Sequence, residues 1–203
     1  FTDRRQRQMC IRDRYIATLN NTHFELIKKC SENNKNILCE KPFTLNYDEG
    51  REVYDYITKN RIIFYEGFAY RSHPQTKIIQ DIVQNNELGE IKNIQSSFGF
   101  KINKIKPDSR LFNKKLGGGA ILDVGCYPLS ILNLFYKDPD SYKFLNTKGN
   151  LTHTNVDDFA EAEIEINKKI RCQIKVSFKE NYQNKTIIEL SLIHISEPTR
   201  PSS

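Results

Sequence analysis

Apolar and polar residues follow two different periods in the first part of the chain. Short β-prone runs at residues 15–18, 36–39 and 61–65 predict strands. Between them, apolar residues recur every three or four positions, which is the period of an amphipathic helix. Strands that alternate with helices predict a parallel sheet with right-handed crossovers, so residues 15–66 are expected to fold as β-α-β-α-β.

Two polar signals predict where the helices of this region begin. Thr22 and Glu25 have the spacing of a capping box, in which each side chain bonds the other residue's amide. Asn46, with Glu49 three residues later, predicts the start of the next helix.

The pattern changes in the middle of the chain. A proline in the first turn predicts a helix that begins at His73 and ends at Gly89. Residues 91–101 alternate as a long strand does, and residues 102–116 read as a polar loop. The glycine run 117–119 then reads as a flexible approach to an apolar helix.

The strongest hairpin pattern lies at residues 161–178, with a turn near Lys168. Pairing Ile166 with Ile170 places opposite charges across the ladder, which favours that register. These charge pairs are Glu165 with Arg171 and Glu161 with Lys175. With a further strand at 184–190, the second half is expected to be an α+β domain with a mostly antiparallel sheet.

Composition indicates a folded protein of one or two domains, with 203 residues, 38% hydrophobic and 28% charged. No apolar run approaches the roughly 20 residues of a membrane span, and no apolar segment follows the arginine-rich start as in a signal peptide. The cysteines have no CxxC spacing, so we interpret them as reduced thiols of a cytoplasmic protein rather than disulfides or metal ligands. They are Cys10, Cys30, Cys39, Cys126 and Cys172.

The two ends show neither period. Residues 1–14 and 191–203 resemble translated sequencing-adapter read-through, so we interpret them as a non-native leader and tail. Five arginines and two aspartates give the leader a net charge of +3, and the tail is neutral, so only half of the formal +6 remains for the rest. A basic surface for nucleic acid is correspondingly less supported.

A charged pair follows the strand at 36–39. Glu40 and Lys41 stand at its carboxyl end, before Pro42, and ligands of open α/β sheets bind just outside such ends. A lysine that is partly desolvated or beside another cation has a pKa closer to working pH, and an oxidised nicotinamide ring is such a cation. Lys41 is therefore a candidate catalytic group, and a solvated salt bridge at a strand end is the simpler alternative.

Asp123 and Tyr127 form a second candidate pair. Pro128 is tolerated only near a helix start, so the helix is expected to begin near 123–125. Residues four apart lie about one turn apart and can face one ligand. A tyrosine can exchange a proton with an alcohol if a nearby ammonium lowers its pKa from about 10. The alternatives are an N-cap aspartate with a packing tyrosine, or a phosphate cradle, although the glycines lack the G-x-G-x-x-G spacing.

Five segments resemble the glucose–fructose oxidoreductase, inositol dehydrogenase and rhizopine catabolism (Gfo/Idh/MocA) oxidoreductases. They are YIATLNNTHFELIKKC, NILCEKPF, YEGFAYRSHPQ, LGEI and GGGAILDVGCYP, in the family's order. The branch with dihydrodiol and xylose dehydrogenases is most similar, because Tyr127 stands where inositol dehydrogenases have histidine. The resemblance implies part of a Rossmann NAD(P)-binding domain at 15–70 and an α+β substrate and dimerisation domain at 71–190.

The resemblance also implies individual roles. The implied catalytic residues are Lys41, Asp123 and Tyr127. The implied cofactor-binding residues are Thr18, Asn20, His23, Glu40, Lys41 and Arg71, and the implied substrate-binding residues are Lys41, Arg110, Asp123 and Tyr127. No metal ligand is implied, and Leu19 departs from the family's usual proline.

We therefore expect a cytoplasmic oxidoreductase that uses NADP or NAD to move a hydride to or from a small sugar, polyol or cyclic diol. A homodimer is expected for the full-length parent, with no nucleic-acid or membrane partner. The glycine motif and the residue that selects NAD or NADP are expected upstream of residue 15, so the chain is interpreted as a truncated, inactive fragment. A non-catalytic NAD(P)-binding sensor and a basic nucleic-acid-binding module are the alternatives.

Overall fold

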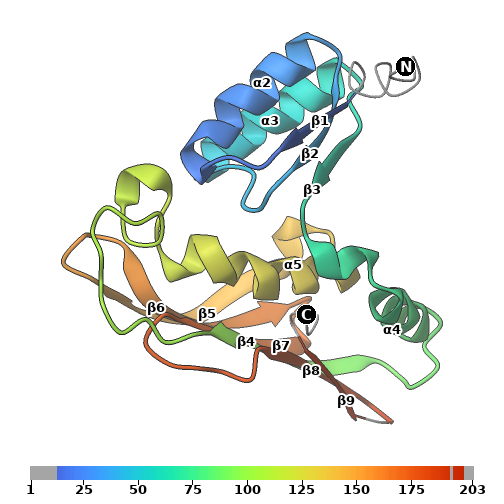
Figure 1. Ribbon diagram of the computed structural model, residues 1–203. Helices are drawn as coiled ribbons and strands as arrows, with labels where there is room; N and C mark the ends of the chain where they lie inside the picture. Colours follow the sequence, from blue (N-terminus) through green and yellow to red (C-terminus); the bar gives the residue numbers. More distant parts are fainter. Residues whose placement is uncertain (1–12, 193, 199–203) are drawn as a thin grey trace, which may run out of the picture. The chain divides into compact units, whose positions relative to one another are not determined.

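The chain divides into two compact units in this computed structural model, which describes residues 13–192 and 194–198. Unit 1 comprises Phe1–Phe68 with Lys115–Gly117, and unit 2 comprises Ala69–Lys114 with Gly118–Ser203. Figure 1 labels the helices and strands of both units.

Unit 1 is a three-stranded parallel sheet with the order β1-β2-β3. Helices α2 and α3 connect successive strands and lie on the same face of the sheet (Figure 1), which confirms the predicted β-α-β-α-β order. The elements are β1 (Asp13–Ile16), η1 (Asn20–Thr22), α2 (His23–Glu32), β2 (Asn36–Cys39), α3 (Tyr47–Lys59) and β3 (Phe64–Glu66). Their buried core consists of Ile16, Ile27, Ile37, Cys39 and Val53.

Strand β1 begins earlier than the polarity pattern indicates. Asp13 and Arg14 fall inside the predicted leader, yet they pair with Asn36 and Ile37 of β2. Both side chains are exposed, so they carry no apolar period. Strand pairing requires only backbone N–H and C=O groups, which is why the side chains did not indicate it.

The two helix-start signals have different outcomes. Asn46 caps α3 as predicted, because its side chain accepts the Glu49 amide at 2.9 Å. The capping box at Thr22 is wrong, since Thr22 makes no side-chain cap bond. Its hydroxyl donates to the Leu19 carbonyl at 2.8 Å instead, because the 3-10 turn η1 already holds Thr22 in a helical conformation.

His23 joins the two loops that follow β1 and β2. Its ring is fully buried, with Nδ1 2.9 Å from the Pro42 carbonyl oxygen and Nε2 3.2 Å from that of Thr18. A neutral imidazole can donate to only one of these acceptors at a time. The contacts fix the loop with Thr18 to the loop with Lys41, within a single unit.

Unit 2 is built on a six-stranded sheet with the order β5-β6-β7-β4-β8-β9. Helix α5 lies across one face of this sheet, with α4 beside it (Figure 1). The strands are β4 (Ile91–Gly99), β5 (Tyr142–Leu151), β6 (Asp157–Ile166), β7 (Ile170–Ser177), β8 (Lys185–Leu190) and β9 (His194–Pro198). The helical segments of unit 2 are η2 (Ala69–Ser72), α4 (Pro74–Gln84), η4 (Ile121–Gly125), α5 (Cys126–Phe135) and η5 (Pro139–Ser141). The short helix η3 (Lys114–Leu116) falls at the boundary between the two units in the sequence.

The predicted hairpin is confirmed in its register. Ile166 pairs with Ile170, and both charge pairs form across the ladder. The distances are 3.4 Å for Glu165 with Arg171 and 3.2 Å for Glu161 with Lys175. Every strand pairing in this sheet is antiparallel except β4 with β7, so the sheet is mostly antiparallel, as expected.

Three features of unit 2 differ from the predictions. Helix α4 ends at Gln84 rather than Gly89, because Asn86 takes a left-handed backbone conformation with φ 55°. Strand β5 had no predicted counterpart, since it is an edge strand whose side chains are nearly all exposed. Strand β9 (His194–Pro198) lies in the predicted tail and pairs with β8 through its backbone.

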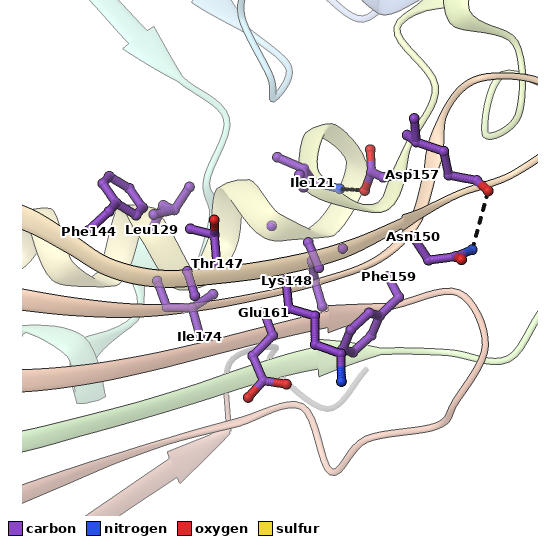
Figure 2. A pocket seen from close by; sticks show the side chains of 16 residues that line it. Ile121, Leu129, Phe144, Thr147, Lys148, Asn150, Asp157, Phe159, Glu161 and Ile174 are labelled. Atoms are coloured by element: carbon purple, nitrogen blue, oxygen red, sulfur yellow. Dashed lines mark hydrogen bonds between the residues drawn. The ribbon is translucent and has the colours of Figure 1, made fainter.

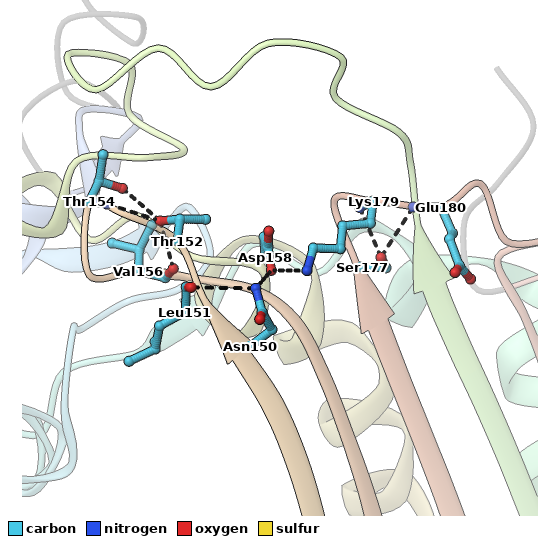
Figure 3. A network of polar contacts seen from close by, with 9 residues as sticks. All are labelled: Asn150, Leu151, Thr152, Thr154, Val156, Asp158, Ser177, Lys179 and Glu180. Atoms are coloured by element: carbon cyan, nitrogen blue, oxygen red, sulfur yellow. Dashed lines mark hydrogen bonds and ion pairs between the residues drawn. The ribbon is translucent and has the colours of Figure 1, made fainter.

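A polar network fixes the start of β6 (Figure 3). The Asp158 side chain accepts from Asn150 Nδ2 at 2.8 Å and lies 3.2 Å from Lys179 Nζ. The Asp158 carbonyl also accepts the Phe178 amide at 2.8 Å. Asp158 is 7% exposed, so its charge is both buried and paired.

The segment Lys114–Phe135 contains an 18-residue stretch with a mean hydropathy of 1.3, which is long and apolar enough for a membrane-crossing helix. Half of this stretch is buried inside the protein. Within the segment, Val124 and Leu132 belong to the core of unit 2, and α5 packs against β4 and β7. These contacts are those of a core helix.

Removing a buried side chain of β6 should destabilise unit 2. Ile164 is 0% exposed, so Ile164→Ala is expected to lower the free energy of unfolding by about 2–5 kcal/mol through lost burial and a cavity. Ile78→Ala, at a residue 58% exposed, should change it by less than about 0.5 kcal/mol. Urea unfolding followed by circular dichroism measures both, and equal effects would contradict the assigned core.

Removing the His23 ring should loosen the strand-end loops of unit 1. His23→Ala removes the ring that contacts the carbonyls of Pro42 and Thr18, and the loss of a donor to one of them should cost about 1–3 kcal/mol of unfolding free energy. The exposed His153 is the matched control, and His153→Ala should have almost no effect. A His23→Ala protein as stable as the parent in the same urea experiment would show that the ring does not join the loops.

Candidate functional site

Glu40 and Lys41 directly follow β2, at the carboxyl end of the parallel sheet, as predicted. The Glu40 amide still bonds to the Ile16 carbonyl at 2.8 Å, and Glu40 Oε1 accepts the Tyr15 hydroxyl at 2.6 Å. That hydrogen bond raises the pKa of Tyr15 above its usual value. Lys41 is half-buried, and the peptide bond from Lys41 to Pro42 is cis.

Glu66, which was not among the predicted site residues, supports the same loop from β3. Its Oε1 accepts the Phe43 amide at 3.2 Å, two residues after Lys41. The next amide, of Gly67, donates to the Cys39 carbonyl at 2.7 Å. The sequence signal for Glu66 is a carboxylate at the end of an apolar strand. The structure pairs Glu66 with Cys39 of β2. Glu66 thus ties the Lys41 loop to the neighbouring strand.

The predicted cofactor residues after β1 lie in different environments. The exposed Thr18 hydroxyl is 2.6 Å from that of Thr22, and Asn20 Nδ2 donates to the Gly117 carbonyl at 3.5 Å. His23 is buried beneath them and contacts main-chain carbonyls, so its ring supports the loop from below. Leu19, at the position where the family usually has proline, is 45% exposed.

Asp123 lies in unit 2, in the single π-helical turn η4 that runs directly into α5. Its side chain is 8% exposed, and its Oδ1 lies 2.8 Å from Arg110 Nη1. Arg110 comes from the predicted polar loop, so the structure brings together two predicted substrate residues. Such a charge-assisted bond is stronger than a neutral one, and single π turns in α-helices frequently occur at functional sites.

Tyr127 lies in the first turn of α5, and its ring packs between two aromatic residues. The ring centroids are 5.2 Å from Phe98 and 6.4 Å from Tyr70. The Tyr70 hydroxyl is 2.6 Å from Ser130 Oγ, and Arg71 Nη2 donates to the Ser130 carbonyl at 3.1 Å. The exposed Arg71 is therefore held against α5, within one turn of Tyr127.

The glycine run is closely packed, not a flexible approach as predicted. A Cβ on Gly118 would lie 2.8 Å from the Leu111 carbonyl oxygen, which no real side chain tolerates. Gly119 has φ +123°, and a Cβ there would overlap the carboxylate of Asp157. Asp157 was also not predicted, and its only sequence signal is a pair of adjacent aspartates at a strand start.

A pocket of about 460 Å³ opens in unit 2 between the η4–α5 segment and strands β5 and β6 (Figure 2). Its lining is mainly apolar and includes Ile121, Leu129 and Phe144. Asp123 and Tyr127 do not line it. Within unit 2, the predicted catalytic side chains and this pocket are therefore separate features.

The cysteines of the described residues are free thiols: Cys30, Cys39, Cys126 and Cys172. Burial raises the pKa of Cys39 and of Cys172 to about 12, so both are unreactive core groups. Cys10 lies outside the described residues. Residues 13–192 and 194–198 contain no group of three or more His, Cys, Asp or Glu side chains that could hold a metal ion.

Solved structures confirm the fold. A 3-ketoreductase from Actinomadura kijaniata, in complex with NADP and TDP-benzene, superposes with a TM-score of 0.75 at 23% identity, over 87% of this chain and 54% of that one. An aldose-aldose oxidoreductase from Caulobacter crescentus gives a TM-score of 0.78 at 18% identity, over 88% and 54%.

Curated relatives are more similar in sequence. A D-xylose 1-dehydrogenase (NADP(+)) from Haloferax volcanii is 35% identical over 126 residues, which are 62% of this chain and 38% of the relative. A trans-1,2-dihydrobenzene-1,2-diol dehydrogenase from Xenopus tropicalis is 32% identical over 146 residues, 71% of this chain and 42% of the relative. The matches thus span about half of these relatives or less.

Two family models match consecutive parts of the chain. The model of the oxidoreductase family with an NAD-binding Rossmann fold matches residues 8–68, and the GFO/IDH/MocA C-terminal domain matches residues 76–192. The second match alone covers more than half of the chain. The chain therefore belongs to the GFO/IDH/MocA family of NAD-binding oxidoreductases.

Proposed function

We propose that the whole protein is an NAD(P)-dependent oxidoreductase that moves a hydride between nicotinamide and a hydroxyl-bearing carbon of a sugar, polyol or cyclic diol. The observation that carries this proposal is the buried Asp123, paired with Arg110 and four residues before Tyr127. Relatives named for the oxidation of xylose and of a dihydrobenzene diol support the substrate class. Because the chain spans about half the length of those relatives, the activity is proposed for the whole protein.

The strand ends of unit 1 offer groups that suit the nicotinamide half of the cofactor. Parallel strands place their carboxyl ends at one edge, where Thr18, Asn20, Glu40 and Lys41 follow β1 and β2. The Glu40 carboxylate already accepts one hydroxyl, from Tyr15, so its chemistry suits a ribose hydroxyl. The pyrophosphate of such a cofactor usually binds at a G-x-G-x-x-G turn, and the 203 residues contain none. We therefore propose only nicotinamide and ribose contacts for the strand-end residues. Relatives named or solved with NADP support NADP, with NAD as the alternative.

Each proposed catalytic residue has a separate task. When bound, the nicotinamide supplies the hydride acceptor or donor. The ammonium of Lys41 favours the phenolate form of Tyr127, and this phenolate takes the proton of the substrate hydroxyl as the hydride leaves. Lys41 also polarises the substrate oxygen. Asp123, which is held by Arg110, accepts a hydrogen bond from a hydroxyl of the substrate and so orients the substrate.

The remaining predicted residues support these groups. We assign His23 the task of holding the Lys41 loop and Arg71 the task of binding the cofactor from its place against α5. The guanidinium of Arg110, 53% exposed, serves both Asp123 and the substrate. A non-catalytic sensor is the weaker candidate, because cofactor binding alone requires no proton relay such as Lys41 and Tyr127.

We also propose that residues 15–70 serve the cofactor and residues 71–190 the substrate and dimerisation, in a cytoplasmic homodimer. The family matches at 8–68 and 76–192 support this division, and the free thiols support a reducing compartment. Light scattering that returns the mass of a single chain for the whole protein would contradict the dimer.

Lys41 gives the sharpest test of catalysis. In the whole protein, Lys41→Ala should lower kcat with NADP and a sugar or diol by about 10²–10⁴-fold, the usual contribution of a general acid–base group. Lys29→Ala, at an exposed lysine of α2, is the matched control and should leave kcat unchanged. Near-normal turnover of Lys41→Ala would exclude the assigned role.

Tyr127→Phe separates proton transfer from packing. The substitution keeps the ring between Phe98 and Tyr70 but removes the hydroxyl, so kcat should fall by about 10²–10⁴-fold while thermal stability changes little. Cofactor binding by the parent without turnover across a sugar and diol panel would favour the sensor instead.

A further inference from the structure

We propose that Asp157 is a positioning residue that fixes the π-helical turn carrying Asp123. The structural part of this proposal stands on contacts within unit 2, and its kinetic consequence rests on the proposed function. Asp157 accepts the backbone amide of Ile121, so it acts on Asp123 through the backbone of the turn.

The first step is a direct bond to the start of the turn. Asp157 Oδ2 accepts the amide of Ile121, the first residue of η4, at 2.7 Å (Figure 2). The first amides of a helix have no partner within the helix. A carboxylate is a favourable acceptor at that end, because the partial charge of a helix start is positive.

The second step is the close packing of Gly119 against the same carboxylate. A side chain at Gly119 would overlap Asp157 Oδ1, and the φ of +123° is one that other residues rarely adopt. The Gly119 carbonyl accepts the Asp123 amide at 3.0 Å. The Asp157 carboxylate therefore contacts the chain at Ile121 and at Gly119, two residues earlier, and the Asp123 amide is bonded to Gly119.

The third step links Asp157 to the partner of Asp123. The Gly119 amide donates to the Leu111 carbonyl at 2.9 Å, and Leu111 follows Arg110 directly. Gly119 is thus bonded to the loop that carries Arg110 and to the turn that carries Asp123. The position of Gly119 against Asp157 bears on both members of the 2.8 Å ion pair.

The fourth step is the rigidity of the strand that carries Asp157. Its neighbour Asp158 is bound by Asn150 and Lys179 (Figure 3). The Asp158 carbonyl also accepts the Phe178 amide. The preceding Val156 carbonyl accepts the Thr152 amide at 2.9 Å. Positioning groups act best from rigid elements, and the start of β6 is one.

The cost of this arrangement is visible at the carboxyl group itself. Burial raises the pKa of Asp157, while the amides of Ile121, Asp157 and Ala120 act in the opposite direction. Its neighbour Asp158 forms an ion pair with Lys179, so the two adjacent carboxylates are held by different kinds of partner. Asp157 is half-buried, and partial desolvation of a carboxylate is costly. The bonds from the amides of the turn offset part of that cost.

The test compares two adjacent aspartates. Asp157→Ala removes the acceptor of the Ile121 amide, whereas Asp158→Asn disturbs the neighbouring network and leaves that amide untouched. The readout is hydrogen exchange of the Ile121 amide by NMR in this chain. Loss of a hydrogen bond to a charged acceptor should make the exchange of the Ile121 amide about 10- to 100-fold faster. Asp157→Ala should show this acceleration, and Asp158→Asn should not.

Asp157→Asn covers the case in which the alanine variant does not fold. Its amide oxygen can still accept the Ile121 amide but is uncharged, so exchange should accelerate by only about 3- to 10-fold. Unchanged exchange at Ile121 in the folded Asp157 variants would overturn the proposal. Equal acceleration in Asp158→Asn would do so too, because it would indicate general loosening of β6.

The kinetic readout uses the whole protein. Asp157→Ala should lower kcat about 10-fold or more with an unchanged KM for NADP, Asp157→Asn should recover part of the loss, and Asp158→Asn should match the parent. Faster exchange at Ile121 with unchanged kcat would show that the turn is fixed by Asp157 but that Asp123 is not catalytic. A parent without turnover would contradict the proposed function and leave the exchange result valid.

Discussion

Backbone groups that helices and strands leave unpaired need other partners, and this constraint shapes both parts of the candidate site. In unit 1, the fully buried His23 ring lies between the carbonyls of Thr18 and Pro42, so the loops after two parallel strands cannot move independently. In unit 2, the unpaired amide at the start of η4 finds the Asp157 carboxylate. In each unit, a polar group away from the proposed chemistry holds the backbone next to a proposed catalytic residue.

The two units obtain their sheets by different means. Unit 1 needs the helices α2 and α3 to return the chain for parallel pairing, and parallel pairing brings the strand ends with Glu40 and Glu66 to one edge. Unit 2 uses the hairpin between β6 and β7, whose charge pairs specify its register. This division matches a family in which a Rossmann domain precedes a second, sheet-based domain.

The predictable features were those with local signals. Alternation and cross-strand charge gave the register of the hairpin, and an apolar run before Glu40 and Lys41 gave the end of β2. Strand β5 lacked such a signal because an edge strand can be exposed along its length. Asp157 could not be predicted, since its partner Ile121 lies 36 residues earlier and only the fold brings them together. The capping box predicted at Thr22 was wrong because the spacing of Thr22 and Glu25 does not indicate that a 3-10 turn precedes the helix.

The packing around Gly119 has a consequence for how such a sequence can diverge. Residues 111, 119 and 157 lie far apart in the chain, yet a Cβ at position 119 would need the carboxylate at 157 to withdraw. A side chain at position 119 would therefore need the carboxylate at position 157 to move or to be replaced by a smaller group. Positions 119 and 157 are therefore coupled through space, although they lie 38 positions apart in the chain.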